Sequence, residues 1–360
     1  MFVDVRKLGA GQACRIAGYG HTVLGEEYLY DNPRFIREVL SPTGRTRLWL
    51  EVGDPSTMSE EELVARADAK MSALPLGIRS RYLYPGPTSM LAAMAAETAL
   101  ADAGWLAADL DAIIVATNTG RGYPSTADMV KLHLDQRSEA LCFDLTEACS
   151  AGVAAIFDGW RGIRSGAWRR VLVIGAENAL TLATPDNHEP ELDNYKDCNL
   201  FGSAAFALAM EAAAVEQFRF FDQLSEPFDG QSEWVRKGPH GFTQDGRRVH
   251  EYIGRAIPPR IVAACQQAGI DPADVRHVFP HMPSRKTVDF FIERLRRLWP
   301  REVFNGCIHE NIATHGNTSA ASSGWLLARA KASGLLRPGD ICIIWSFGSG
   351  MSAAGTAFIF

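Results

Sequence analysis

The sequence predicts an α/β fold made of two related halves, and three observations support this. Short, strongly apolar runs alternate along the chain with longer helical patterns. The helical patterns end in glycine, a common helix stop. The spacing of several motifs in the first half also recurs in the second. With 360 residues, 47% of them apolar, the chain can bury a large core, and two lobes are expected.

Seven apolar runs have the length and composition of buried strands. Runs this apolar are typical of sheets that are covered on both faces. They lie at 111–118, 140–145, 170–177, 203–210, 277–281, 340–347 and 352–360.

Four helical patterns lie between these runs, and each closes on a glycine. Their small and apolar residues predict close packing against the sheets. They lie at 89–104, 149–166, 257–269 and 319–334.

Two of these helices indicate an internal repeat. Cys149 and Asn317 each head a helical pattern that ends in Ser-Gly, with Gly166 and Gly334 both seventeen positions further on. An Ala-Gly helix end is also followed in both copies by Ala-Asp and a strand. Ordered matches of this kind predict two copies of one α/β unit, residues 1–215 and 216–360.

Two polar segments do not fit the repeat. Residues 41–75 are turn-rich in composition and are expected to form an insertion or lid in the first half. The loop at 184–199 carries carboxylates and His188, which raises the possibility of a metal ion. Such loops are usually solvated surface, so we predict no metal site.

The bulk composition excludes several classes of protein. A net charge of −6 argues against a general nucleic-acid binder. No window approaches eighteen consecutive apolar residues, so no membrane span is expected. The first twenty residues lack the pattern of a signal peptide. Seven irregularly spaced cysteines are typical of reduced thiols, which predicts a cytoplasmic location.

Cys149, in the stretch EACSAGVAAI, is the candidate nucleophile. The N–H groups and dipole at a helix start favour an anion, so its thiol is expected to have a lowered pKa. Small neighbours would let an acyl chain approach the backbone. The alternative is a buried, inert cysteine, which is the more frequent role of cysteines in general.

Three further segments accompany this cysteine. His281 ends the strand HVFPH, where a side chain can enter a cleft, although a lone histidine there is more often structural. Asn317 lies in THGNTSAAS, where by itself it would more often be a helix cap. The glycine turn SFGSGM at 346–351 could free a backbone N–H for an oxyanion, or be an ordinary hairpin turn.

Taken together and in this order, these motifs resemble the β-ketoacyl synthase III family of thiolase-fold condensing enzymes. The likeness covers roughly residues 77–360. It implies a thiolase-like fold of two pseudo-symmetric halves in a layered αβαβα arrangement. It is carried by EACSAGVAA, FGSAAFAL, FPHMPS, HGNTSAAS and FGSGMSAAGTAF, with GIRSRY and YPST as two further segments.

The resemblance implies a mechanism. Cys149 would take an acyl group from a thioester. His281 and Asn317 would then bind the carbonyl of a malonyl-type thioester and promote its decarboxylative Claisen condensation. The backbone N–H groups of Cys149 and Ser349 would form the oxyanion hole for the tetrahedral intermediate. No cofactor is expected.

The resemblance also implies a substrate pocket that includes Tyr123, Ser284 and Phe347, and a homodimer. Ser284 in HMPS replaces the asparagine of HQAN in many relatives. Tyr123 takes a position at which relatives place phenylalanine at the dimer-facing end of the pocket.

The nucleotide-binding residues of the family are altered in this chain. Relatives that prime from coenzyme A often carry Trp and Arg shortly before GIR, and this chain offers Met71 and Pro75 there. The donor is therefore expected on an acyl carrier protein, although an acyl-CoA thioester stays open.

A basic segment at 284–301 is the candidate docking site for an acidic carrier protein. The alternative is a solvated amphipathic helix. Its candidate residues are Arg285, Lys286, Arg294 and Arg297, with Arg301 beyond them.

Three functions remain open from the sequence. The first is the condensing enzyme, in a specialised polyketide or natural-product pathway rather than routine fatty-acid initiation. The second is an acyltransferase that passes the Cys149-bound acyl group to an alcohol or amine, with His281 as base. The third is a non-catalytic partner subunit, which the joint presence of Cys149, His281 and Asn317 disfavours.

Overall fold

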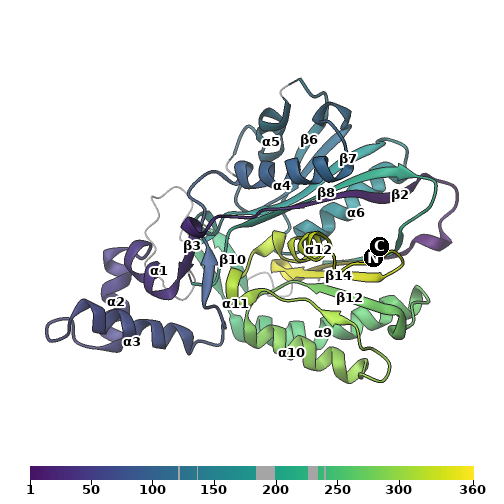
Figure 1. Cartoon of the computed structure of the whole chain (residues 1–360). Coiled ribbons are helices and arrows are strands. Elements are labelled where there is room, and N and C mark those ends of the chain that lie inside the picture. The colour runs from purple at the N-terminus through teal and green to yellow at the C-terminus, as the bar shows by residue number, and fades with distance from the viewer. Residues whose placement is uncertain (121, 136, 184–198, 226–233, 239–240) are drawn as a thin grey trace.

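Two mixed β-sheets form the frame of the molecule in the computed structural model (Figure 1). The structure describes residues 1–120, 122–135, 137–183, 199–225, 234–238 and 241–360. Helices cover the outer face of each sheet and fill the space between the sheets, which gives the predicted α/β class and its layered arrangement. Within these residues, we find no helix with the length and hydropathy needed to cross a membrane.

The first sheet has five strands among the described residues, in the order β2-β8-β7-β5-β6. β5 lies between two parallel neighbours, β6 and β7, and β8 and β2 then extend the sheet in antiparallel fashion. The strands are β2 (Ala13–His21), β5 (Ala112–Ala116), β6 (Leu141–Leu145), β7 (Arg170–Glu177) and β8 (Ala204–Ala213).

The second sheet has six strands among the described residues, in the order β1-β9-β15-β14-β12-β13. Here β12 lies between parallel β13 and β14, and β15 and β9 extend the sheet in antiparallel fashion. β1, from the start of the chain, pairs with β9 at the edge. The strands are β1 (Phe2–Asp4), β9 (Phe218–Ser225), β12 (Val275–Pro280), β13 (Cys307–Ile308), β14 (Ile341–Gly348) and β15 (Ser352–Ile359).

The same order of parallel and antiparallel neighbours thus occurs in both sheets, which confirms the two related halves. We keep the boundary near residue 215 as a proposal, because β8 ends at Ala213 and β9 begins at Phe218. Two short hairpins lie outside the main sheets. They are β3 (Leu29–Asp31) with β4 (Ser80–Tyr82), and β10 (Val235–Gly238) with β11 (Gly241–Gln244).

The helices form three layers around the sheets (Figure 1). α4 and α5 cover the outer face of the first sheet, α6 and α12 pack between the sheets, and α9 and α10 cover the second sheet. The helices of these layers are α4 (Thr88–Ala103), α5 (Thr126–Asp135), α6 (Ala151–Arg164), α9 (Gly246–Gln267), α10 (Arg285–Leu298) and α12 (Ser322–Ala332). Two further short helices are α7 (Ala179–Ala183) and α11 (Ile312–His315).

The segment at 41–75 is helical where its composition predicted turns. It forms α2 (Pro42–Val52) and α3 (Glu60–Ser72), which pack with α1 (Asn32–Glu38) at the lower left of Figure 1. Ser41 caps α2, and Ser59 begins α3 with a capping box. The residues that cap these helices, such as Ser41 and Ser59, are of the polar types that also favour turns, which is why the composition predicted turns. Its role as an insertion or lid stays a proposal.

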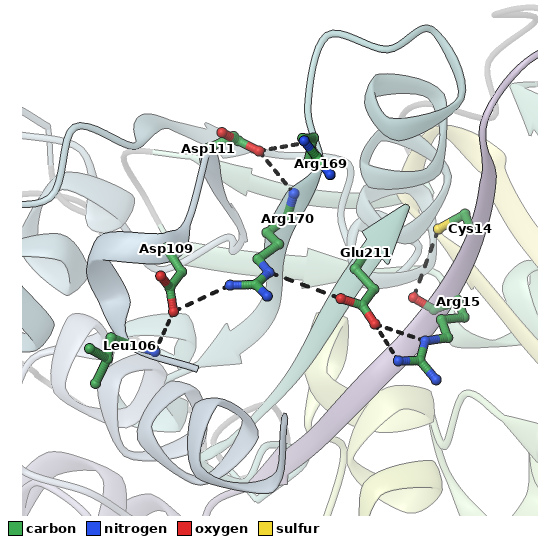
Figure 2. A network of polar contacts seen from close by, with 8 residues as sticks. All are labelled: Cys14, Arg15, Leu106, Asp109, Asp111, Arg169, Arg170 and Glu211. Atoms are coloured by element: carbon green, nitrogen blue, oxygen red, sulfur yellow. Dashed lines mark hydrogen bonds and ion pairs between the residues drawn. The ribbon is translucent and has the colours of Figure 1, made fainter. Parts of the chain in front are cut away.

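A network of charged side chains lies at the end of the first sheet where β5 and β7 begin (Figure 2). Asp111, just before β5, accepts a hydrogen bond from the Arg170 backbone N–H at 2.9 Å. The Arg170 guanidinium lies 3.3 Å from Asp109 and 4.0 Å from Glu211 on β8, which in turn binds Arg15 on β2 at 2.8 Å. These groups are partly exposed, so we expect each pair to contribute little to stability.

Glycines in β2 let α4 lie directly on the strand. A Cβ atom at Gly20 would stand 2.0 Å from the carbonyl oxygen of Ala95 in α4. A Cβ at Gly18 would stand 2.2 Å from the carbonyl oxygen of Ala99. The backbone of the helix cannot yield to such contacts without moving away from the sheet.

We expect Gly20→Ala to lower the free energy of unfolding by about 2–3 kcal/mol, because the added methyl group meets helix backbone. Urea denaturation of the purified protein measures this change. Gly9→Ala is the matched control, since nothing lies within 4 Å of its Cβ position, and it should change stability by less than about 0.5 kcal/mol. Equal stabilities of the two variants would contradict the packing argument.

Candidate active site

A cavity of about 340 Å³ lies where the ends of strands from both sheets meet, and Cys149, His281 and Asn317 all line it. The structure thus brings together three residues from separate segments of the chain. The wall of the cavity also includes Asn118, Phe201, Ser319, Phe347, Gly348 and Ser349. In the described part of the chain, no residue of 41–75 is among its lining residues.

Cys149 lies in the turn that leads from β6 into α6, which begins at Ala151, whereas the sequence predicted Cys149 as the first residue of the helix. The residue before it, Ala148, has a left-handed backbone with φ of 46°, which is strained for a residue with a side chain. The Asn118 side-chain amide holds this turn by donating a hydrogen bond to the Ala148 carbonyl at 3.0 Å. Rigid placement of the sulfur at the cavity wall follows from these contacts.

The acidity of the Cys149 thiol differs from the expectation. Burial raises the pKa of Cys149 to about 12, and the charge of nearby Glu177 raises it further, so the expected lowering of the pKa at the helix start was wrong. The free-energy cost of removing the thiolate from water at this site exceeds the stabilisation that the partial charge of the helix end provides. In the substrate-free protein the sulfur therefore carries its proton.

His281 follows β12 and is buried, with only 3% of its surface exposed. Its Nδ1 lies 3.1 Å from the Ser322 hydroxyl, and its ring meets Phe347 edge-on. Burial lowers the pKa of His281 to about 3, so the imidazole is neutral at physiological pH. When Ser322 donates to Nδ1, the ring carries its hydrogen on Nε2 and acts as a hydrogen-bond donor.

Asn317 is fixed by its own backbone and side chain. Its N–H donates to the Leu200 carbonyl at 2.9 Å, and its carbonyl accepts from the Gly202 N–H at 3.0 Å. Its side-chain oxygen accepts from the Ser319 N–H at 2.8 Å. The side-chain NH₂ is then the group that Asn317 can offer to a ligand.

The glycine turn after β14 closes directly on the nucleophile. A Cβ at Gly348 would stand 2.8 Å from the Cys149 backbone nitrogen. Ser349 begins the short helix η7 (Ser349–Met351), and Gly350 within it has φ of 107°. Cys149, Gly348 and Ser349 all line the cavity.

The structure places the other predicted pocket residues differently. Phe347 lines the cavity, whereas Ser284 caps α10 and accepts from the Thr287 N–H, and its neighbour Pro283 lines the cavity instead. Tyr123 is fully exposed and lies outside this cavity. Its neighbour Pro124 lines a second hollow of about 510 Å³, which contains none of the three central residues.

The predicted docking residues lie on α10 and mostly have local partners. Arg285 pairs with Glu310 at 2.7 Å, and Arg297 pairs with Glu293. The Arg294 guanidinium packs over the Phe290 ring, and Lys286 is exposed. Arg301 lies just beyond the helix.

Three residues of the site were missed by the sequence analysis: Asn118, Glu177 and Ser319. Glu177 is the last residue of the predicted strand at 170–177, and a carboxylate at the end of a buried strand was the available signal. Asn118 follows β5, and Ser319 lies two residues after Asn317.

No group of three metal-ligating side chains occurs among the residues that the structure describes. His188 and most of the candidate metal loop, residues 184–198, lie outside the described residues.

The burial of His281 predicts a pH dependence of stability. Its folded pKa of about 3 lies below the unfolded value of 6.5, so between these pH values the unfolded state binds a proton that the folded state does not. The free energy of unfolding therefore decreases as the pH is lowered. From pH 7 to pH 5 this histidine should cost about 2 kcal/mol. Urea unfolding of wild type and His281→Gln at both pH values measures it. Equal losses in the two proteins would refute the assignment.

Comparisons with known proteins find similarity in both halves of the chain. Residues 143–225 match the family model "3-Oxoacyl-[acyl-carrier-protein (ACP)] synthase III", and residues 265–359 match the model of its C-terminal part. The chain is 34% identical over 280 residues to a β-ketoacyl-[acyl-carrier-protein] synthase III of Rhodobacter capsulatus, covering 74% of this chain and 82% of the relative.

Solved structures agree at the level of the fold. The crystal structure of 3-oxoacyl-(acyl carrier protein) synthase III from Pseudomonas aeruginosa superimposes with a TM-score of 0.76 at 24% identity, covering 97% of this chain and 98% of the other. The priming β-ketosynthase of the R1128 polyketide pathway gives 0.78 at 22% identity, with 98% of both chains covered.

Proposed function

We infer the function of this chain from one premise: it belongs to the β-ketoacyl-[acyl-carrier-protein] synthase III family. It is therefore a condensing enzyme of the ketosynthase III type, a transferase with a thiolase-like fold from a family of fatty acid biosynthesis. The steps, substrates and residue roles below are our proposal for this chain.

In the first half-reaction, Cys149 attacks the carbonyl of an acyl thioester and keeps the acyl group. The tetrahedral oxyanion is stabilised by the backbone N–H groups of Cys149 and Ser349. The support for this pairing is the close approach of the Gly348 backbone to the Cys149 nitrogen. The donor sulfur leaves with its electron pair.

In the second half-reaction, a malonyl-type thioester places its carbonyl oxygen against His281 and Asn317. Loss of CO₂ leaves an enolate, and the Nε2–H of His281 and the NH₂ of Asn317 stabilise its oxygen. The enolate carbon attacks the acyl-cysteine, a carbon–carbon bond forms, and the Cys149 sulfur is released.

The observation that carries this proposal is the shared cavity of Cys149, His281 and Asn317. Asn317 has its side-chain oxygen occupied by Ser319, so that it faces a ligand as a donor. Two donors beside a nucleophilic sulfur are what an enolate needs. Transfer of the acyl group to an alcohol or amine would call for a base, and His281 with a pKa of about 3 is a poor one.

We propose that acyl groups reach the cavity on an acyl carrier protein. Met71, which stands where many relatives have a nucleotide-stacking tryptophan, is buried in the core and offers no surface for an adenine ring. The start of α10 lies beside this region, since the Lys286 N–H donates to the Pro75 carbonyl. Lys286, with Arg285, Arg294 and Arg297, is the proposed docking surface. The altered nucleotide site also leads us to propose a specialised pathway, such as polyketide assembly.

We also propose a homodimer through the edge of the first sheet. β6 is the terminal strand of that sheet among the described residues. Leu141 on this strand is 55% exposed, and Leu132 and Tyr123 nearby in sequence are also exposed. Apolar side chains beside an unpaired edge favour pairing with a second copy.

Cys149→Ser tests the nucleophile. We expect the variant to form no β-ketoacyl product and no acyl adduct when it is incubated with acyl thioesters and malonyl-carrier protein, because a serine hydroxyl is far less acidic and less nucleophilic than the thiol. Intact-mass spectrometry and product analysis measure both outcomes. Cys307→Ser, which changes an exposed cysteine, is the control. Condensation by Cys149→Ser would sink the proposed function.

Asn317→Ala tests the assignment of the second half-reaction. Removing one donor to the enolate should slow decarboxylation on the order of 10²- to 10³-fold. Acylation of Cys149 should be nearly unaffected, because Asn317 acts on the other substrate. Release of CO₂ from malonyl-carrier protein and the acyl-enzyme mass separate the two steps. Parallel loss of acylation and decarboxylation would count against the assignment.

A further inference from the structure

Behind the cavity wall lies a carboxylate that the reaction scheme above leaves unused. Glu177, at the end of β7, is fully buried. Its carboxylate oxygens accept hydrogen bonds from the Asn118 backbone N–H at 3.2 Å and from the Asn118 side-chain amide at 2.5 Å. The Ala320 N–H lies 3.4 Å from the same carboxylate. Glu177 is not among the residues that line the cavity.

Ser319 connects this carboxylate to the nucleophile. Its hydroxyl donates to Cys149 Sγ at 3.4 Å, and its side chain also hydrogen-bonds with Glu177. Ser319 has a left-handed backbone with φ of 44°, a strained conformation that keeps the side chain in this position. Turning the O–H from the sulfur to the carboxylate lets the oxygen accept the thiol hydrogen in return.

Cys149 must lose a proton before it can attack a thioester, and the described neighbours leave few acceptors. His281 is a weak base and has its Nδ1 occupied by Ser322. The cavity wall also carries Glu147, whose carboxylate accepts a hydrogen bond from the Gln223 side chain at 3.3 Å and has no hydroxyl linking it to the sulfur among the described contacts. The carboxylate of Glu177, one hydroxyl away, is the basic group that the geometry connects to the thiol.

We propose that Glu177 takes up the proton of Cys149 through the Ser319 hydroxyl and holds it while the cysteine carries an acyl group. The thiol hydrogen moves to the Ser319 oxygen as the Ser319 hydrogen moves to the carboxylate. The sulfur electron pair forms the new bond to the acyl carbon, and the donor sulfur leaves and takes a proton from water. This step rests on the proposed function of Cys149.

The proton returns in the second half-reaction. When the enolate displaces the Cys149 sulfur, the sulfur regains a proton through Ser319, and Glu177 becomes a carboxylate again. Between the two steps the acyl-cysteine, the carboxylic acid and His281 are all uncharged. A malonyl carboxylate can then enter the buried cavity without meeting a negative charge on Glu177 or on Cys149.

The ionisation of these groups agrees with this scheme. Burial raises the pKa of Glu177 to about 7, so that it can both accept and return a proton near neutrality. The groups that face it are Asn118 from the loop after β5, Ser319 and Ala320 from η6 (Ser319–Ala321), and Cys149 from the turn before α6. Of these four, only Cys149 can ionise.

Glu177 acts through Ser319 and does not touch the substrate, so it is a positioning residue, and a pH profile is its proper test. The rate constant for alkylation of Cys149 by iodoacetamide is measured from pH 5.5 to 9. Peptide mapping is needed because Cys307 is exposed and will also react.

In wild type we expect the rate constant to rise about tenfold per pH unit up to pH 7 and then to stay level. Above pH 7 the thiolate forms by internal transfer, with no net exchange with solvent. Glu177→Gln has no carboxylate, so its rate constant should keep rising, exceeding wild type by about tenfold for each unit above pH 7. Its rate of condensation should nevertheless fall on the order of 10²-fold, because in turnover the proton has no internal acceptor and no internal source for its return to the sulfur, whereas in the slow alkylation it can exchange with solvent.

Ser319→Ala is the matched control, since it keeps the charge of Glu177 and removes the path. Its alkylation rate constant should still be independent of pH above pH 7. Its kcat for condensation should fall, with KM little changed. A purely structural role would move reactivity and turnover in the same direction, whereas the proposal requires opposite directions in Glu177→Gln.

The outcomes can be told apart. A wild-type profile without a bend near pH 7, or a bend that persists in Glu177→Gln, overturns the proposal. If circular dichroism shows that Glu177→Gln does not fold, the presence or absence of a bend near pH 7 in the wild-type alkylation profile decides whether the proposal stands. If wild type forms no acyl adduct with any thioester, the proposed function fails. The alkylation profile then still reports whether Glu177 and Cys149 share a proton.

Discussion

The contact between the backbones of the two halves is the constraint on which this site depends. At Gly348 the space of a side chain is filled by the amide of Cys149, and at Gly152 it is filled by the Ala320 carbonyl, 2.1 Å from where a Cβ would stand. The end of β14 thus rests on the nucleophile turn, and the start of α6 rests on η6. Because backbone meets backbone, the cavity cannot widen or shift without parting the halves.

Burial, more than any single partner, sets the chemistry of the cavity. It keeps the Cys149 thiol protonated, the His281 imidazole neutral and the Glu177 carboxyl near half-ionisation. A helix start beside a cysteine is often expected to supply a thiolate, but here desolvation outweighs it. At such a site we expect catalysis to transfer a proton from the thiol to a neighbouring group at the time of reaction, because a thiolate is not present beforehand.

The sequence was most informative where one physical rule acts locally. Buried strands such as β5, β7 and β14 were predicted because sheets covered on both faces require continuous apolar runs, and Gly104 marked the end of α4. The edge strands β1 and β2 were missed, because β1 has only three residues and β2 mixes Arg15 with glycines. The helix at 257–269 begins earlier, at Gly246, since its first turns are polar.

The site was predictable to the extent that motifs carry it. Cys149, His281 and Asn317 were found because each sits in a distinctive local stretch. Glu177 and Asn118 were not, since their importance comes from distances across the fold between residues far apart in sequence. The pKa of Cys149 was mispredicted for the same reason, because the residues next to it in sequence do not reveal how deeply its side chain is buried.

The pairing of β1 with β9 has a consequence for synthesis of the chain. Phe2 finds its partner at Asp222, so the first strand has to wait until the ribosome has released most of the polypeptide. β1 thus closes the edge of a sheet whose other strands all belong to the later half. Until β9 has been synthesised, the hydrogen-bonding groups of β1 lack the partner strand that they have in the folded protein and are open to pairing with another sheet edge.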